Sequence, residues 1–288
     1  NISPISEVFD GGESVSDTAS HIIKDTRAFR FGDGFFESMR IVNGRALFLE
    51  NHFARIISTA NALKIQLPTG FTIDLLQSQV LEVLRRNDIT HGGRMRITFY
   101  RKSSGFYLPK QDEMTYYIEA EPLPDNAFVM NATGKMVDIY TDFKKDVTKM
   151  SVFKTLNAQL YVMAAIHARD KGLDEALIQN NKLAVIESNS SNIFIVSNGV
   201  LYTPTLEDGP VAGTMRMNII NLALENKIKV YECTLNPHNL LAADEMFITN
   251  AVRGIEWIGG YRTKRYFNDM SRRIMDLLNQ HAIAYTTA

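Results

Sequence analysis

Alternating apolar and polar positions predict strands in the first part of the chain, and a tight turn joins the first two. Residues 34–41 and 45–49 flank Asn43-Gly44, a dipeptide that favours a two-residue β-hairpin loop. Apolar residues then recur at helical spacing through 53–63. The remaining elements predicted here are a helix at 71–84 and strands at 94–99 and 114–120. This part therefore combines helix and sheet.

A short segment with two prolines separates this part from a second one. The run Glu121-Pro-Leu-Pro-Asp-Asn126 has no periodicity, so we place a linker at 122–130 between an N-terminal α/β domain, 1–121, and a C-terminal domain, 131–288. The strands predicted in the second domain are 136–140, 175–179, 183–187, 193–196, 200–202, 229–234 and 245–248. Its predicted helices are 158–171, 214–226 and 266–281. The fold class is α+β (α/β), with two domains.

Charge and cysteine content restrict the function classes. The 288 residues include 31 basic and 32 acidic side chains, so no basic excess is available for a nucleic-acid backbone. Cys233 is the single cysteine, and no Cys/His cluster has the spacing of a metal site. Residues 1–25 are polar, and no stretch approaches the roughly 18 apolar residues of a membrane helix. We expect a cytoplasmic protein with no metal, no nucleic-acid partner and no membrane partner.

Three short segments carry candidate chemistry. Lys154 lies in the apolar run Val-Phe-Lys-Thr-Leu, and burial of a lysine lowers its pKa, as a Schiff-base lysine requires. Gly213-Thr214 precedes an amphipathic helix, whose N-terminus attracts anions. Glu187 ends an apolar strand before a turn rich in Ser and Asn. Each also has an ordinary explanation: a snorkelling lysine, a helix cap and a loop cap.

Taken in order, these segments resemble one family. The stretches Phe-Gly-Asp-Gly-Phe-Phe-Glu-Ser-Met-Arg at 31–40 and Leu-Glu-Asn-His-Phe-Ala-Arg at 49–55 are similar to the N-terminal signature of class IV aminotransferases and their lyase relatives. The run 153–157, Phe-Lys-Thr-Leu-Asn, resembles the segment of the cofactor lysine. The later similar blocks are Glu-Ser-Asn-Ser-Ser-Asn-Ile-Phe at 187–194, Gly-Thr-Met-Arg at 213–216 and Ile-Thr-Asn-Ala at 248–251. Several blocks in family order are more specific than any lone motif.

The resemblance implies a fold-type IV enzyme, similar to D-amino-acid aminotransferases, with pyridoxal 5′-phosphate (PLP) as cofactor. Lys154 would hold PLP as a Schiff base and move protons at the substrate α-carbon. Glu187 would keep the pyridine nitrogen protonated, and Arg55 would bind the phosphate. Arg96 would bind a substrate carboxylate, with a solvated strand arginine as the alternative. His52 is assigned a structural role. The other residues implied are Ser191, Asn192, Thr214, Met215, Asn250 and Ala251 for the cofactor and Phe36 for the substrate.

Three activities share these blocks. D-amino-acid aminotransferases have an Arg-x-His trap in the loop after the 94–99 strand, where this chain reads Ser-Ser-Gly-Phe-Tyr-Leu-Pro at 103–109. Branched-chain aminotransferases typically have a Gly after the Phe-Glu pair and a Tyr five residues past the lysine, where this chain has Ser38 and Gln159. The phrases Phe-Gly-Asp-Gly, Lys-Thr-Leu-Asn and Thr-Asn-Ala are more similar to 4-amino-4-deoxychorismate lyases.

We therefore expect a lyase of folate biosynthesis that releases pyruvate and leaves p-aminobenzoate. A class IV aminotransferase that acts on branched-chain or other amino acids with 2-oxoglutarate is the first alternative. A non-catalytic binding protein on the same scaffold is the second, and the set Lys154, Glu187 and Arg55 argues against it. The resemblance also implies a homodimer that acts on a small molecule.

Overall fold

Two compact units make up the chain, and each is described by itself. The computed structural model describes residues 8–10, 13–15 and 26–287, so most of the polar stretch 1–25 lies outside the described residues. The first unit consists of Asn1–Ala127, Lys154–Asn157 and Ala282–Ala288, and the second of Phe128–Phe153 and Ala158–His281. The change of unit after Ala127 falls within the predicted linker 122–130. The return of the Lys154 segment to the first unit has no counterpart in the sequence pattern.

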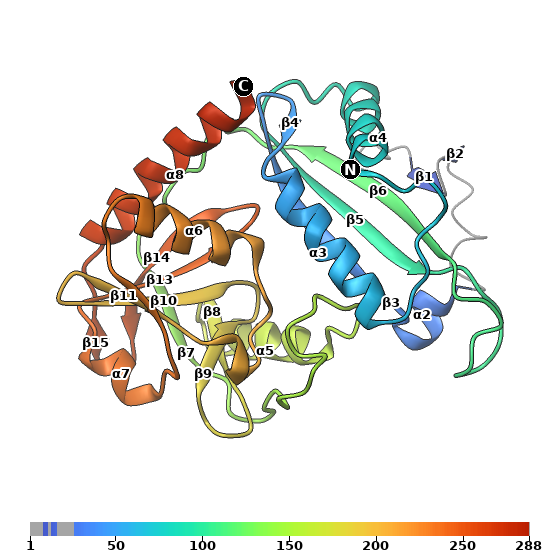
Figure 1. Ribbon diagram of the computed structural model, residues 1–288. Helices are drawn as coiled ribbons and strands as arrows, with labels where there is room; N and C mark the ends of the chain where they lie inside the picture. Colours follow the sequence, from blue (N-terminus) through green and yellow to red (C-terminus); the bar gives the residue numbers. More distant parts are fainter. Residues whose placement is uncertain (1–7, 11–12, 16–25, 288) are drawn as a thin grey trace. The chain divides into compact units, whose positions relative to one another are not determined.

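A four-stranded antiparallel sheet is the frame of the first unit (Figure 1). Its order is β4-β3-β5-β6, with β4 at Arg45–Ala46, β3 at Gly34–Val42, β5 at Gly93–Arg101 and β6 at Met114–Pro122. The helices α3, Leu49–Ala62, and α4, Ile73–Arg86, pack on one face through a core that includes Phe35, Ile56, Leu76, Phe99 and Ile118. The remaining elements are α2, Arg27–Phe31, and the strand pair β1, Val8–Asp10, and β2, Glu13–Val15.

The segment around Lys154 joins this sheet by pairing with β3. The Phe36 N–H donates to the Lys154 carbonyl at 3.1 Å, and the Leu156 N–H donates to the Gly34 carbonyl at 3.0 Å. Thr155 lies opposite Phe35 in an antiparallel bridge. Residues opposite one another share a face of a sheet, and successive residues alternate. Lys154 therefore lies on the face of Phe36, away from the helices.

Six strands of the second unit close into a barrel (Figure 1). Neighbours along the ring are β10, β13, β14, β7, β8 and β9, and β9 returns to β10 through the pair Glu187 and Asn192. The ring strands are β7 Lys135–Ile139, β8 Glu175–Gln179, β9 Val185–Ser188, β10 Asn192–Ser197, β13 Glu245–Asn250 and β14 Gly254–Tyr261. The strands β11 Val200–Thr203, β12 Val230–Glu232 and β15 Lys264–Arg265 extend the sheet beyond the ring. The barrel strands carry one apolar core that includes Val137, Leu177, Ile193, Ile248 and Ile258.

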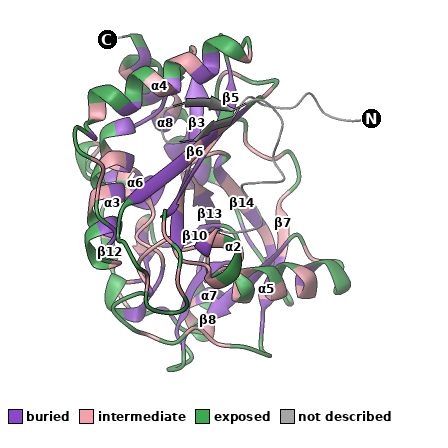
Figure 2. Cartoon of the chain, turned by 90° about the vertical axis from the view of Figure 1, so that its right-hand side faces the viewer, coloured by how far each residue is buried: buried purple, intermediate pink, exposed green. Residues whose placement is uncertain are grey.

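Helices cover parts of the second unit. They are α5 Gln159–Asp170, α6 Thr214–Glu225, α7 Pro237–Ala242, α8 Asp269–Thr287 and the short η1 Leu206–Asp208. Only the part of α8 up to His281 belongs to this unit. The helix α5 packs on β8 through Ala164 and Ala168, which share a core cluster with Ile178 and Ile186. Figure 2 shows the resulting burial, with strands such as β6 and β13 largely buried and the outer side of α5 exposed. No helix among the described residues is long and apolar enough to cross a membrane.

One predicted element needs correction, and some elements were not predicted. The predicted strand 45–49 is wrong beyond Ala46, because Phe48 takes a left-handed conformation, with φ 57°, and the helix α3 begins at Leu49. The strand β14 was not predicted, since Gly259 and Gly260 weaken the pattern of a strand. The helix α7 was also missed, and its six residues are too few to show helical spacing.

Candidate active site

Lys154, Phe36 and Arg96 lie on one face of the first unit's sheet. The Lys154 Nζ atom is 4.4 Å from the centroid of the Phe36 ring, and the Arg96 Cζ atom is 3.7 Å from it. The Arg96 Nε atom also donates to Thr98 Oγ1 at 3.2 Å. The aromatic ring thus contacts two cations. An amine that can move a proton lies beside a guanidinium that can bind a carboxylate.

The environment of Arg96 favours contact with an anion. Burial lowers the pKa of Arg96, while the neighbouring Tyr117 and Glu119 act in the opposite direction. Glu119 lies opposite Arg96 across β5 and β6, and burial raises the pKa of this carboxyl group although Arg96 opposes the shift. Arginine retains its charge under such conditions. A partly buried guanidinium therefore remains positive, and a charge contact there is stronger than one in open water.

Glu37, His52 and Arg55 form a buried cluster on the helix-covered face of the same sheet. Glu37 Oε1 accepts from Arg55 Nε at 2.7 Å, and Oε2 accepts from Arg55 Nη2 at 2.6 Å and lies 2.6 Å from His52 Nδ1. Burial raises the pKa of Glu37, but Arg55 and His52 outweigh it and hold the pKa at about 2. Burial lowers the pKa of His52, against its hydrogen bond to Glu37. The predicted phosphate ligand Arg55 is thus paired with a carboxylate, and His52 has a structural partner.

Three donors converge on the carboxylate of Glu187 in the second unit. Glu187 Oε1 accepts from Lys145 Nζ at 2.7 Å and from the Tyr161 hydroxyl at 2.8 Å, and Oε2 accepts from the Val211 N–H at 2.9 Å. Lys145 Nζ also donates to the Tyr161 oxygen at 2.8 Å. Burial, followed by the charge of Glu187, raises the pKa of Tyr161, so its phenol stays a donor. The carboxylate is therefore fixed in position by groups on three segments.

A β-bulge decides where Glu187 points. Between β8 and β9, Glu187 lies opposite Ile178 and Ser188 lies opposite Leu177, and a register shift follows toward Val185. Because opposite residues share a face, Ser188 faces the barrel core with Leu177, and Glu187 faces outward with Ile178. Unbroken alternation would have placed Glu187 on the core face of Val185. The bulge thus removes this charge from the apolar interior.

The other predicted cofactor residues of the second unit gather at one end of the barrel. Asn192 Nδ2 donates to the Thr249 carbonyl at 2.7 Å, and Asn250 Nδ2 donates to Ser191 Oγ at 2.9 Å. A Cβ atom on Gly213 would lie 2.2 Å from Asn192 Oδ1, so the glycine allows the start of α6 to approach β10. The residues brought together in this way are Ser191, Asn192, Thr214, Met215, Asn250 and Ala251, at two turns and one helix N-terminus.

The groups present at this end suit a phosphate. The helix α6 follows Gly213, and no side chain caps it. The first N–H groups of a helix have no partner within the helix and carry partial positive charge, and Thr214 and Met215 supply the first two. Asn192 donates to the backbone, Asn250 donates to Ser191, and Ser191 Oγ also accepts from the Arg253 side chain. Their contribution to an anion site is therefore to hold the two turns and the helix start in place.

The chain belongs to the class IV aminotransferase family, because residues 34–258 match the model of that family. It is a PLP-dependent enzyme, either an aminotransferase or a lyase, with the two-part mixed fold of its relatives. A protein of Methanocaldococcus jannaschii with the proposed name branched-chain-amino-acid aminotransferase is 31% identical over 255 residues, which cover 86% of this chain and 85% of that protein.

Two solved structures show the same fold at lower identity. The branched-chain aminotransferase from Thermoproteus uzoniensis with norvaline has a TM-score of 0.87 at 23% identity, over 97% of this chain and 95% of the other. The 4-amino-4-deoxychorismate lyase from Pseudomonas aeruginosa has a TM-score of 0.80 at 21% identity, over 95% and 98% of the two chains. Fold likeness therefore includes proteins of both reaction types and does not decide between them.

Three residues of these clusters are absent from the sequence prediction. Glu37 has a local signal, because a charged residue occupies a position that alternates toward the core of β3. Lys145 and Tyr161 have none. They lie 42 and 26 residues from Glu187 in the chain, and only the folded second unit brings them to its carboxylate.

Proposed function

We propose that this PLP enzyme is a 4-amino-4-deoxychorismate lyase, which converts its substrate into p-aminobenzoate and pyruvate. The contact of both Lys154 and Arg96 with the Phe36 ring carries the proposal, because it supplies a proton-transferring amine close to a carboxylate ligand. The loop 103–109 supports the lyase over a D-amino-acid aminotransferase, since it lacks the Arg-x-His trap. Ser38 and Gln159 support it over a typical branched-chain aminotransferase.

Lys154, Arg96 and Glu187 would each have a separate role in the reaction. PLP, when bound, accepts the electron pair released at the ring carbon that bears the substrate amino group. Lys154 Nζ removes the proton from that carbon, and Arg96 binds a substrate carboxylate. Glu187, fixed by Lys145 and Tyr161, holds a proton at the pyridine nitrogen. The ring C–O bond to the enolpyruvyl group would then break as the ring becomes aromatic, and Lys154 would return the proton to the methylene carbon of the released enolate, which gives pyruvate. No second substrate is required.

For the cofactor phosphate we propose the N-terminus of α6, with Thr214 and Met215, and the turns at Ser191-Asn192 and Asn250-Ala251. Arg55 remains a proposed phosphate ligand, but its pairing with Glu37 changes the expected energetics. A phosphate would share the guanidinium with a carboxylate that already neutralises it. Replacement of Arg55 would therefore affect the stability of the first unit as well as PLP affinity.

A branched-chain aminotransferase is the second candidate, and the 31% identical relative from Methanocaldococcus jannaschii favours it. In that case Arg96 would bind the carboxylate of the amino acid. The same Lys154 and Glu187 would act, because both reactions begin with the same deprotonation. The difference lies in where the proton returns, and an aminotransferase stops after half a cycle until a keto acid arrives.

Product formation without a keto acid tests the proposal. The PLP-loaded enzyme should convert an excess of aminodeoxychorismate into equal amounts of p-aminobenzoate and pyruvate over many turnovers, measured by mass spectrometry. Borohydride reduction and peptide mapping should place a pyridoxyl group on Lys154, and Lys154→Ala should lose both the label and turnover. Efficient turnover of leucine with 2-oxoglutarate, with aminodeoxychorismate inert, would replace the lyase by the aminotransferase.

A further inference from the structure

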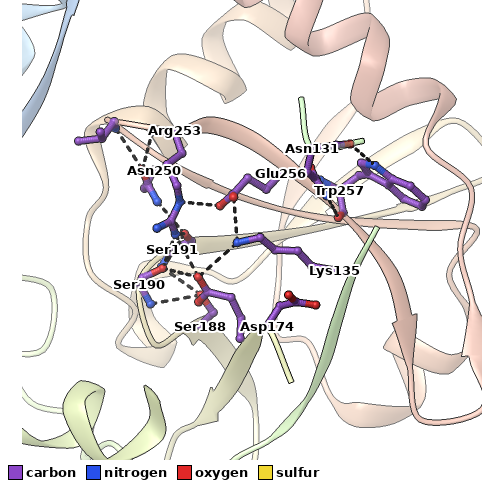
Figure 3. A network of polar contacts seen from close by, with 12 residues as sticks. Asn131, Lys135, Asp174, Ser188, Ser190, Ser191, Asn250, Arg253, Glu256 and Trp257 are labelled. Atoms are coloured by element: carbon purple, nitrogen blue, oxygen red, sulfur yellow. Dashed lines mark hydrogen bonds and ion pairs between the residues drawn. The ribbon is translucent and has the colours of Figure 1, made fainter. Parts of the chain in front are cut away.

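Four charged residues at the phosphate end of the barrel form a closed ring of alternating sign (Figure 3). Lys135 Nζ lies 2.8 Å from Glu256 Oε1, and Arg253 Nε lies 2.6 Å from Glu256 Oε2. Arg253 Nη2 lies 3.0 Å from Glu175 Oε1, which in turn lies 3.8 Å from Lys135 Nζ. Two cations and two carboxylates therefore neutralise one another.

The ring closes the end of the apolar barrel core. Lys135, Glu175 and Glu256 each precede a core residue of the same strand by two positions. Residues two apart in a strand share a face, so these charged side chains continue the rows of core side chains at the mouth of the barrel. Glu175 is only 3% exposed. Ion pairs in such surroundings are screened far less than surface pairs, and the loss of one partner leaves a buried charge.

Glu175 and Arg253 also bind the turn between β9 and β10. Glu175 Oε2 accepts from Ser188 Oγ at 2.9 Å, and Oε1 accepts from Ser190 Oγ at 2.7 Å. Arg253 Nη2 donates to Ser190 Oγ at 2.6 Å and to Ser191 Oγ at 3.3 Å. Ser188 Oγ in turn accepts from the N–H groups of Ser190 and Ser191. The carboxylate and the guanidinium thus fix the conformation of this turn.

The same arginine belongs to the second turn, between β13 and β14. The Arg253 N–H donates to Asn250 Oδ1 at 2.8 Å, and Asn250 Nδ2 donates to Ser191 Oγ at 2.9 Å. Arg253 therefore holds its own turn through its backbone and the neighbouring turn through its side chain. Figure 3 shows Asn250, Ser191 and Arg253 close to one another. Glu175 and Glu256 compensate the charge of Arg253, so this side chain holds the two turns in place and is not itself an anion site.

We propose that Arg253 and Glu175 are positioning residues for the cofactor phosphate. They hold the Ser190-Ser191 and Asn250-Ala251 turns in the geometry that a phosphate requires, without touching it. This inference rests on the proposed phosphate site at these turns. It predicts a loss that is specific to ligands with a phosphate, because the groups around Glu187 and Lys154 are held by other contacts.

The test compares PLP with pyridoxal, which lacks the phosphate. Arg253→Met keeps the apolar stem and removes the guanidinium. Its dissociation constant for PLP should rise by about tenfold or more, whereas that for pyridoxal should change by less than about threefold. Both are measured by absorbance titration of the cofactor-free protein. Arg262→Met is the matched control, because Arg262 pairs with Asp138 at an exposed position and should leave both affinities unchanged.

Further variants keep the inference falsifiable if Arg253→Met folds poorly. Glu175→Gln retains the shape of the side chain and should show the same selective loss for PLP. Arg253→Lys keeps the charge and should recover part of the affinity. Equal losses for PLP and pyridoxal, or an unchanged PLP affinity, would overturn the positioning role. A wild-type protein that binds PLP but is no lyase leaves this role standing, whereas one that binds no PLP overturns it together with the cofactor assignment.

Discussion

The carboxylate of Glu37 couples protonation to the stability of the first unit. Its pKa lies at about 2 in the folded protein, against a reference of 4.5, since Arg55 and His52 outweigh the effect of burial. A pKa that folding lowers contributes stability above the unfolded pKa, and this contribution is lost as the pH falls through the folded pKa. A shift of this size corresponds to about 3 kcal/mol. Acid should therefore weaken the first unit between pH 4.5 and about 2.

Urea unfolding of the wild type and of Glu37→Gln checks this coupling. At pH 7 the variant should be less stable by about 3 to 5 kcal/mol, because Arg55 loses its buried partner. The gap should narrow as the pH falls below 4.5 and Glu37 of the wild type becomes protonated. Glu82→Gln is the control, since its pairs with Arg85 and Arg86 are solvated and screened by salt. A gap that is constant with pH would refute the coupling.

Candidate residues could be selected from the sequence where they lie within short blocks that resemble the family. The family resemblance selected Lys154, Glu187 and Arg55, and the structure places each in a polar or aromatic cluster. Their partners were not predictable, because Lys145 and Arg253 reach their carboxylates across other strands. Pairing over long chain separations depends on register and bulges, and neither is written in a short motif.

Among the elements, the start of β3 depends on the absence of a side chain at Gly34. A Cβ atom there would lie 2.3 Å from the Phe99 carbonyl oxygen and 2.9 Å from Leu156 Cδ1. Gly34→Ala should therefore displace the paired Lys154 segment from β3. We expect the dissociation constant for PLP to rise by about tenfold, with slower borohydride labelling of Lys154.

A second glycine serves as the control for that variant. Gly70 has φ 79°, and a Cβ atom on it would meet nothing within 4 Å. Gly70→Ala should cost about 1 kcal/mol of stability through backbone strain and leave PLP binding unchanged. If Gly34→Ala binds PLP as the wild type does, the close approach at β3 does not position Lys154.

Element prediction failed where pairing overrides local preference. The strand β14 contains Gly259-Gly260 and a register shift at that point, yet it pairs with β13 on one side and β7 on the other. Hydrogen bonds to two neighbours stabilise a strand that its own composition would not favour. The predicted strands 34–41, 94–99 and 175–179 agree with β3, β5 and β8 because their side chains alternate or are uniformly apolar.

For the whole molecule, we expect a homodimer in solution. The loop 103–109 exposes three consecutive side chains, Phe106, Tyr107 and Leu108, each by 85% or more. Arg27 donates to the carbonyl groups of this loop, at 3.2 Å for Tyr107. A fixed loop with three exposed apolar side chains favours contact with another protein surface. Light scattering should give about twice the chain mass of 32.5 kDa.

Substitution of the loop tests which surface is used. The double variant Phe106→Ser and Tyr107→Ser should shift the equilibrium toward the monomer at low concentration. Phe29→Ser is the control, because Phe29 is a single exposed ring at 74%. A wild-type protein that scatters as a monomer would contradict the expected dimer, and a dimer unaffected by the double variant would place the contact elsewhere.

The division of the chain into two parts could be predicted from the proline-containing segment. Which residues belong to each part could not. Lys154–Asn157 belongs to the first unit although 26 residues of the second unit, Phe128–Phe153, precede it in the chain. Backbone hydrogen bonds to β3 decide this, and composition carries no trace of them. A boundary drawn by sequence position alone therefore separates Lys154 from the unit whose sheet it pairs with.

The barrel of the second unit closes where β9 pairs with β10. β9 and β10 meet through one residue pair, Glu187 and Asn192, at the end where the phosphate is proposed to bind. Because so few contacts join these two strands, local unfolding should separate them before other strands of the barrel. A ligand that binds the ends of both strands would make this local opening less frequent. Deuterium uptake by the backbone around Ser188 and Ser191 should then report the fraction of protein molecules with bound PLP, independently of the absorbance of the cofactor.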